Sequence, residues 1–417
     1  MTTPSAPAPA ARATQTLAHN MKLLAHHELE GFGGMGEGIA MQLADDGRRI
    51  LWMAHESAPK NFTAVDVSDP RQPKLVVQTE LPHMQVRSNS LEISGNLMAV
   101  AYQTKAVGQQ PAGFDLFDIS VPEQPVRLSH FDCSGPHSRG VHALWFVDGK
   151  TVHMAAGAPD FEPHDPKDDQ IYRIVDVSDP RAPQEIGRWW LPGTRKGDTE
   201  PRPERLPAAF DTGFRAHNTN VFPERPDRAY VGYIDGGAFV LDIADPKNIT
   251  VFAHWNHSPP FNGFTHTVLP LFDRKLWVVS DECVQDDGKD WPKLVWMVDV
   301  RRENHPMPIG TFPMPPVEVF GKRGGRFGAH NLHENLPSPV AFRSDTIIIG
   351  TFFNGGVRVY DTTHPYRVEE IAYFVPGAPR LSPAGAVQLN DVYVDDRQIV
   401  YTVDRFGGGL YILELTL

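Results

Sequence analysis

One short phrase recurs along the chain and constrains its fold more than any other feature. Its clearest copy, Ile174–Pro183, reads IVDVSDPRAP and is a short apolar strand that ends in a turn. Proline has no amide hydrogen for a strand ladder and restricts the residue before it, so the Asp-Pro pair ends the strand. The side chain of Asp179 can also hydrogen-bond the backbone of the turn.

Seven copies of the phrase are present, and each has an acid at the same position. The acids are Asp66, Asp118, Asp176, Asp242, Asp299, Asp361 and Glu414. The copies are spaced by about 50 to 65 residues, and a repeat of this size built from strands and turns indicates a propeller or a solenoid.

Each repeat contains four predicted strands, as the residues of the fourth repeat illustrate. Its strands begin near His217, Ala229, Ala238 and Ile249, and turns rich in Pro, Asp and Gly separate them. The turn at 235–237, Asp-Gly-Gly, has residue types that tolerate a positive φ. The sequence therefore predicts an all-β fold, a seven-bladed β-propeller of four-stranded antiparallel blades.

The seventh repeat ends after its third strand, and its fourth strand is expected to come from the N-terminus. Residues Lys22–Leu29 are similar to the outer strands of the other repeats. We expect them to pair into blade seven, which closes the ring and removes an exposed edge. A single propeller domain then spans residues 21–417, and residues 1–20, rich in Ala, Pro and Thr, are predicted to be a disordered tail.

The charge and the apolar pattern argue against a nucleic-acid partner and against a membrane protein. The formal net charge is −12, whereas nucleic acids and anionic membranes attract basic faces. No run of about 18 apolar residues is present, so no transmembrane segment is predicted. Residues 1–20 lack the apolar core of a signal peptide, and the two cysteines, Cys133 and Cys283, make no disulfide framework. We expect a cytoplasmic location.

The repeated phrase resembles the LVIVD-repeat family, a group of predicted seven-bladed β-propellers. The resemblance covers nearly the whole chain after residue 20 and implies an architecture, not an activity, because propellers host many functions. In layout alone, the chain is similar to the carotenoid oxygenases and the selenium-binding or methanethiol oxidase proteins. That likeness implies metal-binding histidines at one mouth of the channel.

The first residues of the inner strands are the candidates for chemistry. Inner strands line the channel of a propeller and start at one face, so their first residues form a ring around one mouth. The ring residues are Glu37, Asn89, His142, His217, His266, His330 and Asn390. Four imidazoles from consecutive blades predict a site for one divalent transition metal. Iron is favoured, with zinc and manganese as alternatives.

Each of these histidines has a structural alternative, since a polar residue at this position can hydrogen-bond a neighbouring blade. His333 follows His330 by three residues and in a regular strand points to the opposite side. We therefore expect His333 to be structural or to support the metal ligands. The other histidines, among them His254 and His257, are expected at the surface.

Arginines accompany the ring residues, and they predict binding of an anionic group. They are Arg87, Arg139, Arg215, Arg326 and Arg405. Several guanidinium groups near one mouth suit a carboxylate or a phosphate. Alternatively, each arginine pairs with an acid of the same face, such as Asp235, Asp281, Glu282 or Asp404. Long loops on this face, such as Ala158–Gln170 and Pro192–Asp211, are expected to cover the site.

Three functional hypotheses follow. The first is a metal-dependent enzyme, an oxidoreductase or a hydrolase or lyase, that acts on a small carboxylate-bearing substrate. The histidines hold the metal, the arginines hold the substrate, and Glu37, Asp235 or Asp281 moves protons. The second is a scaffold for protein interaction without catalysis. The third is a metal-independent hydrolase or lyase with a mouth histidine as acid or base and the arginines as an oxyanion clamp.

Overall fold

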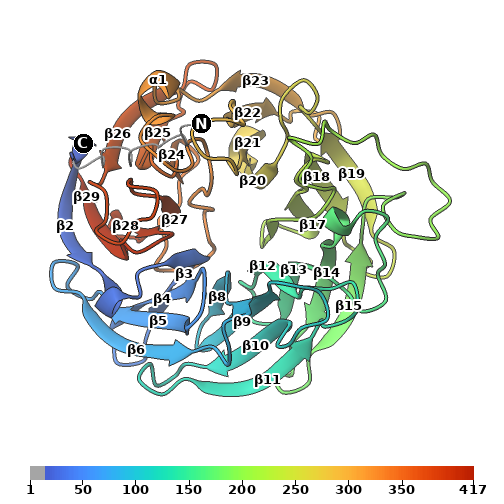
Figure 1. Cartoon of the computed structure of the whole chain (residues 1–417), viewed down its shortest axis with the longest axis horizontal. Helices are drawn as coiled ribbons and strands as arrows, with labels where there is room; N and C mark the ends of the chain where they lie inside the picture. Colours follow the sequence, from blue (N-terminus) through green and yellow to red (C-terminus); the bar gives the residue numbers. More distant parts are fainter. Residues whose placement is uncertain (1–14) are drawn as a thin grey trace, which may run out of the picture.

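The computed structural model describes residues 15–417. These residues form seven antiparallel sheets around a central channel (Figure 1). Each sheet extends from an inner edge at the channel to an outer strand at the rim, so the prediction of a seven-bladed β-propeller is confirmed. The α-helix within this part is α1 (Val317–Phe320). Within the same residues, no helix is long and apolar enough to cross a membrane.

Five blades follow the chain without interruption, inner strand first. Blade one has β3 (Met35–Leu43), β4 (Arg49–His55), β5 (Lys60–Asp66) and β6 (Lys74–Glu80). Blade two has β7 (Val86–Arg87) and β8 (Leu91–Ser94), which both pair with β9 (Leu97–Thr104), then β10 (Gly113–Asp118) and β11 (Val126–Asp132). Blade three has β12 (Val141–Trp145), β13 (Thr151–Ala156), β14 (Ile171–Asp176) and β15 (Gln184–Trp189). Blade four has β16 (Thr219–Phe222), β17 (Arg225–Gly232), β18 (Ala238–Asp242) and β19 (Thr250–Trp255). Blade five has β20 (Thr265–Leu271), β21 (Leu276–Asp281), β22 (Val295–Asp299) and β23 (Met307–Thr311).

In six of the seven phrases, the repeated acid is the last residue of a strand and holds the turn that follows. In blade one, the Asp66 Oδ1 atom accepts a hydrogen bond from the Ser68 amide at 2.9 Å. In blade three, Asp176 accepts one from Ser178 at 2.8 Å, and four further copies make the same contact. A short acceptor two residues ahead satisfies an amide that the ended strand leaves unpaired. The phrase recurs because the same strand of the blade must end at this place, before the turn to the outer strand.

Blade seven closes the ring with a strand from the other end of the chain. It has β27 (Leu389–Val394), β28 (Ile399–Asp404) and β29 (Leu410–Leu415), and its outer strand is β2 (Met21–His27). Figure 1 shows the blue β2 along the outside of the red β29. The pairing is antiparallel, from Met21 opposite Leu415 to His27 opposite Leu410. The predicted closure by an N-terminal strand is confirmed.

Blade six differs from the prediction at its inner position. Its strands are β24 (Ile347–Thr351), β25 (Val357–Asp361) and β26 (Glu369–Val375). Where an inner strand was expected from His330, residues 330–333 run beside β24 without forming a regular strand. The His330 amide donates to Thr351 O at 3.0 Å, and the His333 amide donates to Ile349 O at 2.8 Å. His330 therefore keeps the place of an inner-strand residue.

The predicted disordered tail, residues 1–20, is wrong for its last part. Residues 1–14 lie outside the described residues, but β1 (Leu17–His19) pairs with β26, with Leu17 opposite Val375. The Asn20 side chain adds a hydrogen bond from Nδ2 to Ile371 O at 2.9 Å. The outer edge of β26 offers unpaired backbone groups, and these order a segment whose composition gives no strand signal.

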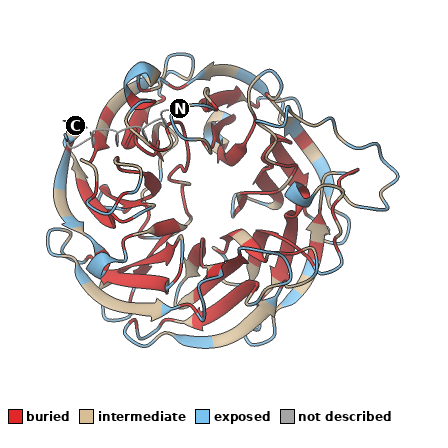
Figure 2. Ribbon diagram, in the orientation of Figure 1, coloured by how far each residue is buried: buried red, intermediate tan, exposed pale blue. Residues whose placement is uncertain are grey.

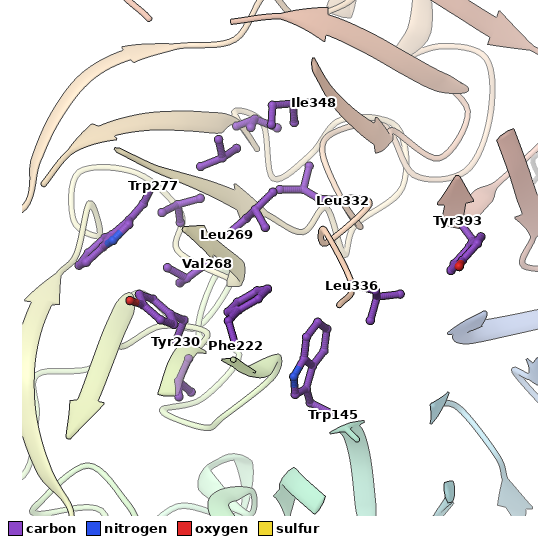
Figure 3. Packing of buried hydrophobic residues seen from close by; sticks show 14 of the residues in the cluster. Trp145, Phe222, Tyr230, Val268, Leu269, Trp277, Leu332, Leu336, Ile348 and Tyr393 are labelled. Atoms are coloured by element: carbon purple, nitrogen blue, oxygen red, sulfur yellow. The ribbon is translucent and has the colours of Figure 1, made fainter. Parts of the chain in front are cut away.

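Burial decreases from the channel to the rim (Figure 2). Inner and middle strands are largely buried, whereas the outer strands β6 and β11 are half-buried in their middle and exposed at their ends. Large aromatic side chains fill the space between neighbouring blades (Figure 3). The ring centroids of Trp145 and Phe222 lie 5.3 Å apart, and those of Tyr230 and Trp277 lie 6.3 Å apart. This packing fixes how neighbouring blades are inclined and therefore where their inner strands point.

Removal of β2 should open the ring, because β29 would lose its partner. We expect a chain that begins at residue 29 to aggregate and to unfold at a lower temperature than a chain that begins at residue 21, which keeps β2. Six residue pairs join β2 to β29, and a net contribution of roughly 0.5–1.5 kcal/mol per hydrogen bond makes their loss worth several kcal/mol. Thermal unfolding and size-exclusion chromatography measure the difference. Equal stability of the two chains would show that blade seven closes in another way.

Candidate metal centre

The four ring histidines meet at the channel mouth as a row of neighbouring rings. His142 lies in β12 and His266 in β20, His217 lies two residues before β16, and His330 lies beside β24. Successive ring centroids are 4.4 Å (142 to 217), 3.9 Å (217 to 266) and 4.7 Å (266 to 330) apart. His217, His266 and His330 are at most 1% exposed. Four blades thus bring together the side chains that the sequence analysis singled out.

The carboxylate of Glu37, from β3 on the other side of the ring, faces all four imidazoles. Its Oε2 atom lies 3.9 Å from the Nε2 atoms of His142 and His217 and 3.8 Å from that of His266. Its Oε1 atom lies 3.7 Å from His330 Nε2. These are distances between atoms that surround a common point, and they are too long for hydrogen bonds.

Hydrogen bonds at Nδ1 turn the Nε2 lone pairs toward this point. His217 Nδ1 donates to Asn218 Oδ1 at 2.9 Å, whereas His142 Nδ1 lies 3.1 Å from Gln103 Oε1 and 3.3 Å from Arg87 Nη2, which can only donate. His330 Nδ1 donates to the carbonyl of Asn390 at 2.7 Å. An acceptor at Nδ1 keeps the proton on that nitrogen and leaves Nε2 free, which is the arrangement of metal-ligating histidines.

Two further observations test whether the residues fit a metal ion. His142 Nε2 and His217 Nε2 lie 2.8 Å apart, so two lone pairs face each other unless a cation or a proton joins them. Two nitrogens at right angles around a metal, each about 2.0–2.1 Å from it, would lie about 2.9 Å apart. His266 Nε2, His330 Nε2 and Glu37 Oε2 are buried without a hydrogen-bond partner. Such orphaned donor atoms fit a bound cation.

The protonation of these groups also suits a metal. Burial lowers the pKa of His217 to about 4 and that of His330 to about 3, and it lowers the pKa of His142 well below its usual value. Those imidazoles are therefore uncharged at neutral pH, the form that binds metals. Burial also opposes ionisation of Glu37, but the contact with His266 and the other imidazoles holds the pKa of Glu37 well below its usual range.

Glu282, which directly follows β21, is a second carboxylate at the site and was not predicted to act there. Its Oε2 atom lies 3.7 Å from His217 Nε2 and its Oε1 atom 3.7 Å from His330 Nε2. Three sets of donor atoms lie within 4.8 Å of one another: Glu37 with His142 and His217, Glu37 with His266 and His330, and Glu282 with His217 and His266. Each set has two histidines and one carboxylate.

The structure does not bring the other two predicted catalytic acids to the histidines. The Asp235 carboxylate accepts hydrogen bonds from the amide and hydroxyl of Thr212 and from the amide of Gly213. Asp281 accepts one from the Leu294 amide at 3.0 Å and lies 3.1 Å from His257 Nε2. Both acids hold loops of this face and make no contact with the four ring histidines among the described residues, so their catalytic role stays a prediction without support from this geometry.

His257 is likewise buried, not at the surface as expected, and packs against Trp255 and Trp296. Neighbouring strand residues alternate in direction, so the sequence could have suggested Glu282 as an alternative to Asp281. No signal in the sequence pairs His257 with Asp281.

Three of the five predicted arginines hold the acids and amides around the histidines. Arg87 Nη2 donates to Gln103 Oε1 at 2.7 Å, and Arg326 Nη1 donates to Glu282 Oε1 at 2.8 Å. Arg87 and Arg405 share the carboxylate of Glu56, with Arg405 Nη2 at 2.6 Å. The alternative that arginines pair with acids of the same face holds for these three, and Glu282 is one of the acids expected to do so.

Arg139 and Arg215 retain donors that the protein does not use. Arg139 makes one hydrogen bond to an acid, from Nε to Asp169 Oδ2 at 2.6 Å. Arg215 Nη1 lies 3.5 Å from Asp169 Oδ1, and Arg215 Nε is buried without a partner. Two guanidinium groups therefore share one carboxylate, which leaves a net positive charge among the three side chains. Asp169 belongs to the predicted covering loop Ala158–Gln170.

His333 is structural, one of the two roles expected for it. Its Nε2 atom donates to Phe342 O at 2.7 Å, and its Nδ1 atom accepts from the Val394 amide at 3.2 Å. Both ring nitrogens are used by the backbone, which leaves none for a metal.

Comparisons with known proteins support the fold and the repeat. The LVIVD repeat family model matches residues 169–189, which contain most of the clearest copy of the phrase. The chain carries an LVIVD repeat. The β-propeller domain of Cps50 (Swd1) from Myceliophteria thermophila superposes with a TM-score of 0.52 at 12% identity, over 91% of this chain and 96% of that one. At this identity the likeness shows the fold alone. No curated protein matches the sequence.

Replacement of a residue that orients a ligand should weaken metal binding without unfolding the protein. Asn218→Leu removes the acceptor at His217 Nδ1 and lets the imidazole place its proton on Nε2. We expect about 10–100-fold weaker metal binding, the usual effect of losing such a partner. Gln124→Leu, an equivalent change at an exposed turn of the opposite face, is the control. Titration of metal-free protein with Mn²⁺ measures both, and equal affinities would show that Asn218 does not orient a ligand.

Proposed function

We propose that the protein is a metal-dependent enzyme that acts on a small carboxylate-bearing substrate at the histidine mouth of the propeller. The observation that carries this proposal is the convergence of four Nε2 atoms within 3.9 Å of the Glu37 carboxylate. Two of these imidazoles, His217 and His330, have their Nδ1 protons directed away from that point by hydrogen bonds. A set of side chains built only to join blades has no need of either feature.

The donor set favours iron. Each of the three candidate ligand groups contains two histidines and one carboxylate, the set that non-haem iron oxygenases use. Bound there, the metal would supply Lewis acidity and, if it is iron, redox capacity. The reaction class would then be an oxidation, whereas zinc would indicate hydrolysis or elimination.

The histidines, carboxylates and arginines of the mouth would each have a different role. His142, His217, His266 and His330 would hold the metal, and Glu37 would complete the ligand set or accept a proton at the same place. Glu282, oriented by Arg326, is the second carboxylate within reach. Arg139 and Arg215 are suited to orient the substrate, because their free donors and surplus charge complement a carboxylate.

The metal site is tested by single replacement of its ligands. In His217→Ala and His266→Ala we expect metal content to fall at least tenfold from about one ion per chain and activity to be lost, because each removes one of few donors. Thermal stability should change little, since sheet packing holds the ring together. His254→Ala on β19 is the control and should leave metal content unchanged. Elemental analysis of the purified proteins measures the outcome.

The opposite results would decide between the other hypotheses. If the wild-type protein holds no metal even after reconstitution, the proposal fails. The propeller would then be a scaffold for protein interaction or a metal-independent hydrolase or lyase. Full metal content in both histidine variants would show that the metal sits elsewhere.

The arginine site is tested by binding of simple anions to metal-loaded protein. Arg215→Ala and Arg139→Ala should each weaken the binding of acetate by roughly 1.5–3 kcal/mol, the scale of a hydrogen bond to a charged group. Arg181→Ala, in an exposed turn on the opposite face, is the control. Calorimetric titration with acetate and with phosphate measures the affinities. Unchanged affinities would show that these arginines serve only Asp169.

A further inference from the structure

A cavity of about 40 Å³ lies in the channel behind the histidine site. Glu37 lines it, so the same side chain borders both the imidazoles and the cavity. A buried water needs roughly 10–15 Å³ of such space, so the cavity has room for two or three. A second cavity of about 20 Å³ shares Glu92, Leu336 and Tyr393 with the first. Its other lining residues include Met41, at the far end of β3, so the cavities follow one another along the channel.

Three more carboxyl groups line the first cavity, and each comes from a different blade. Glu92 lies in β8, Asp391 lies in β27, and Glu334 follows the inner segment of blade six. Glu92 Oε1 accepts from the Ile93 amide at 2.9 Å, and Asp391 Oδ1 accepts from the Val392 amide at 2.8 Å. They lie too far apart to form a compact metal site, since no such group containing them exists among the described residues.

Glu334 is held by two amide side chains. Its Oε1 atom accepts hydrogen bonds from Asn218 Nδ2 at 2.7 Å and Asn220 Nδ2 at 2.9 Å. Asn218 also accepts the proton of His217 Nδ1. The cavity carboxyl and the metal-facing imidazole are therefore bound to one amide.

No basic side chain neutralises these acids from within the cavities. Among the described residues, neither cavity is lined by lysine or arginine. The other titratable groups near the acids are Glu37, Tyr393, His333 and, beside Glu334, His266. His333 is uncharged because its two nitrogens serve the backbone. Four carboxylates around so small a space cannot all be ionised without a countercharge.

A buried hydroxyl group indicates that water fills the cavity. Thr219 is 1% exposed and lines the cavity, and its hydroxyl has no hydrogen-bond partner among the described residues. Buried hydroxyls are rarely left unpaired, and water is their usual partner in a polar cavity. Water there would join the carboxyl groups, which do not touch one another.

We propose that Glu92, Glu334 and Asp391 form a proton store in the channel that exchanges protons with the metal centre through cavity water and Glu37. Each proton leaves as a carboxylic acid becomes a carboxylate, and it returns by the reverse step. The inference rests on the proposed metal site, because a bound cation is what draws protons out of the store. It adds a role for three acids that bind neither metal nor substrate.

The pKa shifts of the three carboxyl groups agree with a role as a proton store. Burial raises the pKa of Glu92 to about 8 and the pKa of Asp391 well above its usual value, with repulsion from neighbouring acids as a further cause. Burial also raises the pKa of Glu334, although the hydrogen bonds from Asn220 and Asn218 and the nearby His266 oppose this. At neutral pH they hold protons that ordinary carboxyls would have lost. A divalent charge near Glu37 favours their ionisation.

Proton release on metal binding tests the proposal. Metal-free protein is titrated with Mn²⁺ at pH 7.5 in two buffers that differ in ionisation enthalpy, which gives the number of protons released per ion. His142, His217 and His330 are already uncharged at this pH, and protons that the wild type releases but a variant without the store acids does not release come from the store. We expect release from the wild-type protein and loss of most of it in Glu92→Gln/Asp391→Asn. Glu303→Gln, outside both cavities, should match the wild type.

Two outcomes separate this inference from the proposed function. If Mn²⁺ binds without proton release, or if the double variant releases as many protons as the wild type, the proton store is overturned and the metal site stands. If Mn²⁺ does not bind, the proposed function fails. The proton store, which rests on the metal site, then fails with it. Infrared spectroscopy of the metal-free protein at pH 6.5 is an independent check of the store, because the absence of a protonated carboxyl band that weakens in Glu92→Gln overturns it even when Mn²⁺ binds.

Discussion

The pairing of β2 with β29 is the contact on which the other features depend. It joins the two ends of the chain, fixes the circumference of the ring and leaves blade seven without an open edge. Only in a closed ring do residues from blades one, three, four, five and six lie around one axis. The Glu37 carboxylate then faces His142, His217, His266 and His330 across the channel. Strand pairing at the rim and packing between the sheets stabilise the ring. Side chains at the mouth therefore need to contribute little to the stability of the fold.

The fold could be predicted from the sequence because each blade repeats the same short sequence of a strand followed by a turn. The acid of six phrases caps its own turn within two residues, and a contact of that range is visible in sequence. Ring closure was also predictable, since one strand was missing and one unpaired strand pattern was available. The pairing of β1 with β26 was not, because residues 17–19 have no pattern and are ordered only by the edge that they meet.

The histidines of the candidate site could be predicted from the sequence, but the residues that orient them could be predicted less well. The four histidines share one position in the repeat, and the repeat places them together. Glu282, Gln103 and Asp169 come from strand ends and loops whose direction no repeat determines. Asp281 and Glu282 show the difference, because Asp281, the last residue of β21, faces His257, whereas Glu282, the next residue, faces His217. Adjacent acids thus have unrelated roles, and only the fold separates them.

The two sides of Glu37 differ in charge, and the proposed chemistry follows from this difference. On the mouth side, Arg139 and Arg215 share a single carboxylate, so the rim attracts anions. On the channel side, the cavity is lined by carboxyls and, among the described residues, by no lysine or arginine, so an anion that passed the metal would meet further acids. Under the proposed function, a carboxylate substrate would be held at the mouth, because the acids of the channel side would repel it. Glu37 lies between the histidine mouth and the acid-lined cavity. In the proposed chemistry, it is therefore the side chain through which a charge at the mouth acts on the acids of the cavity.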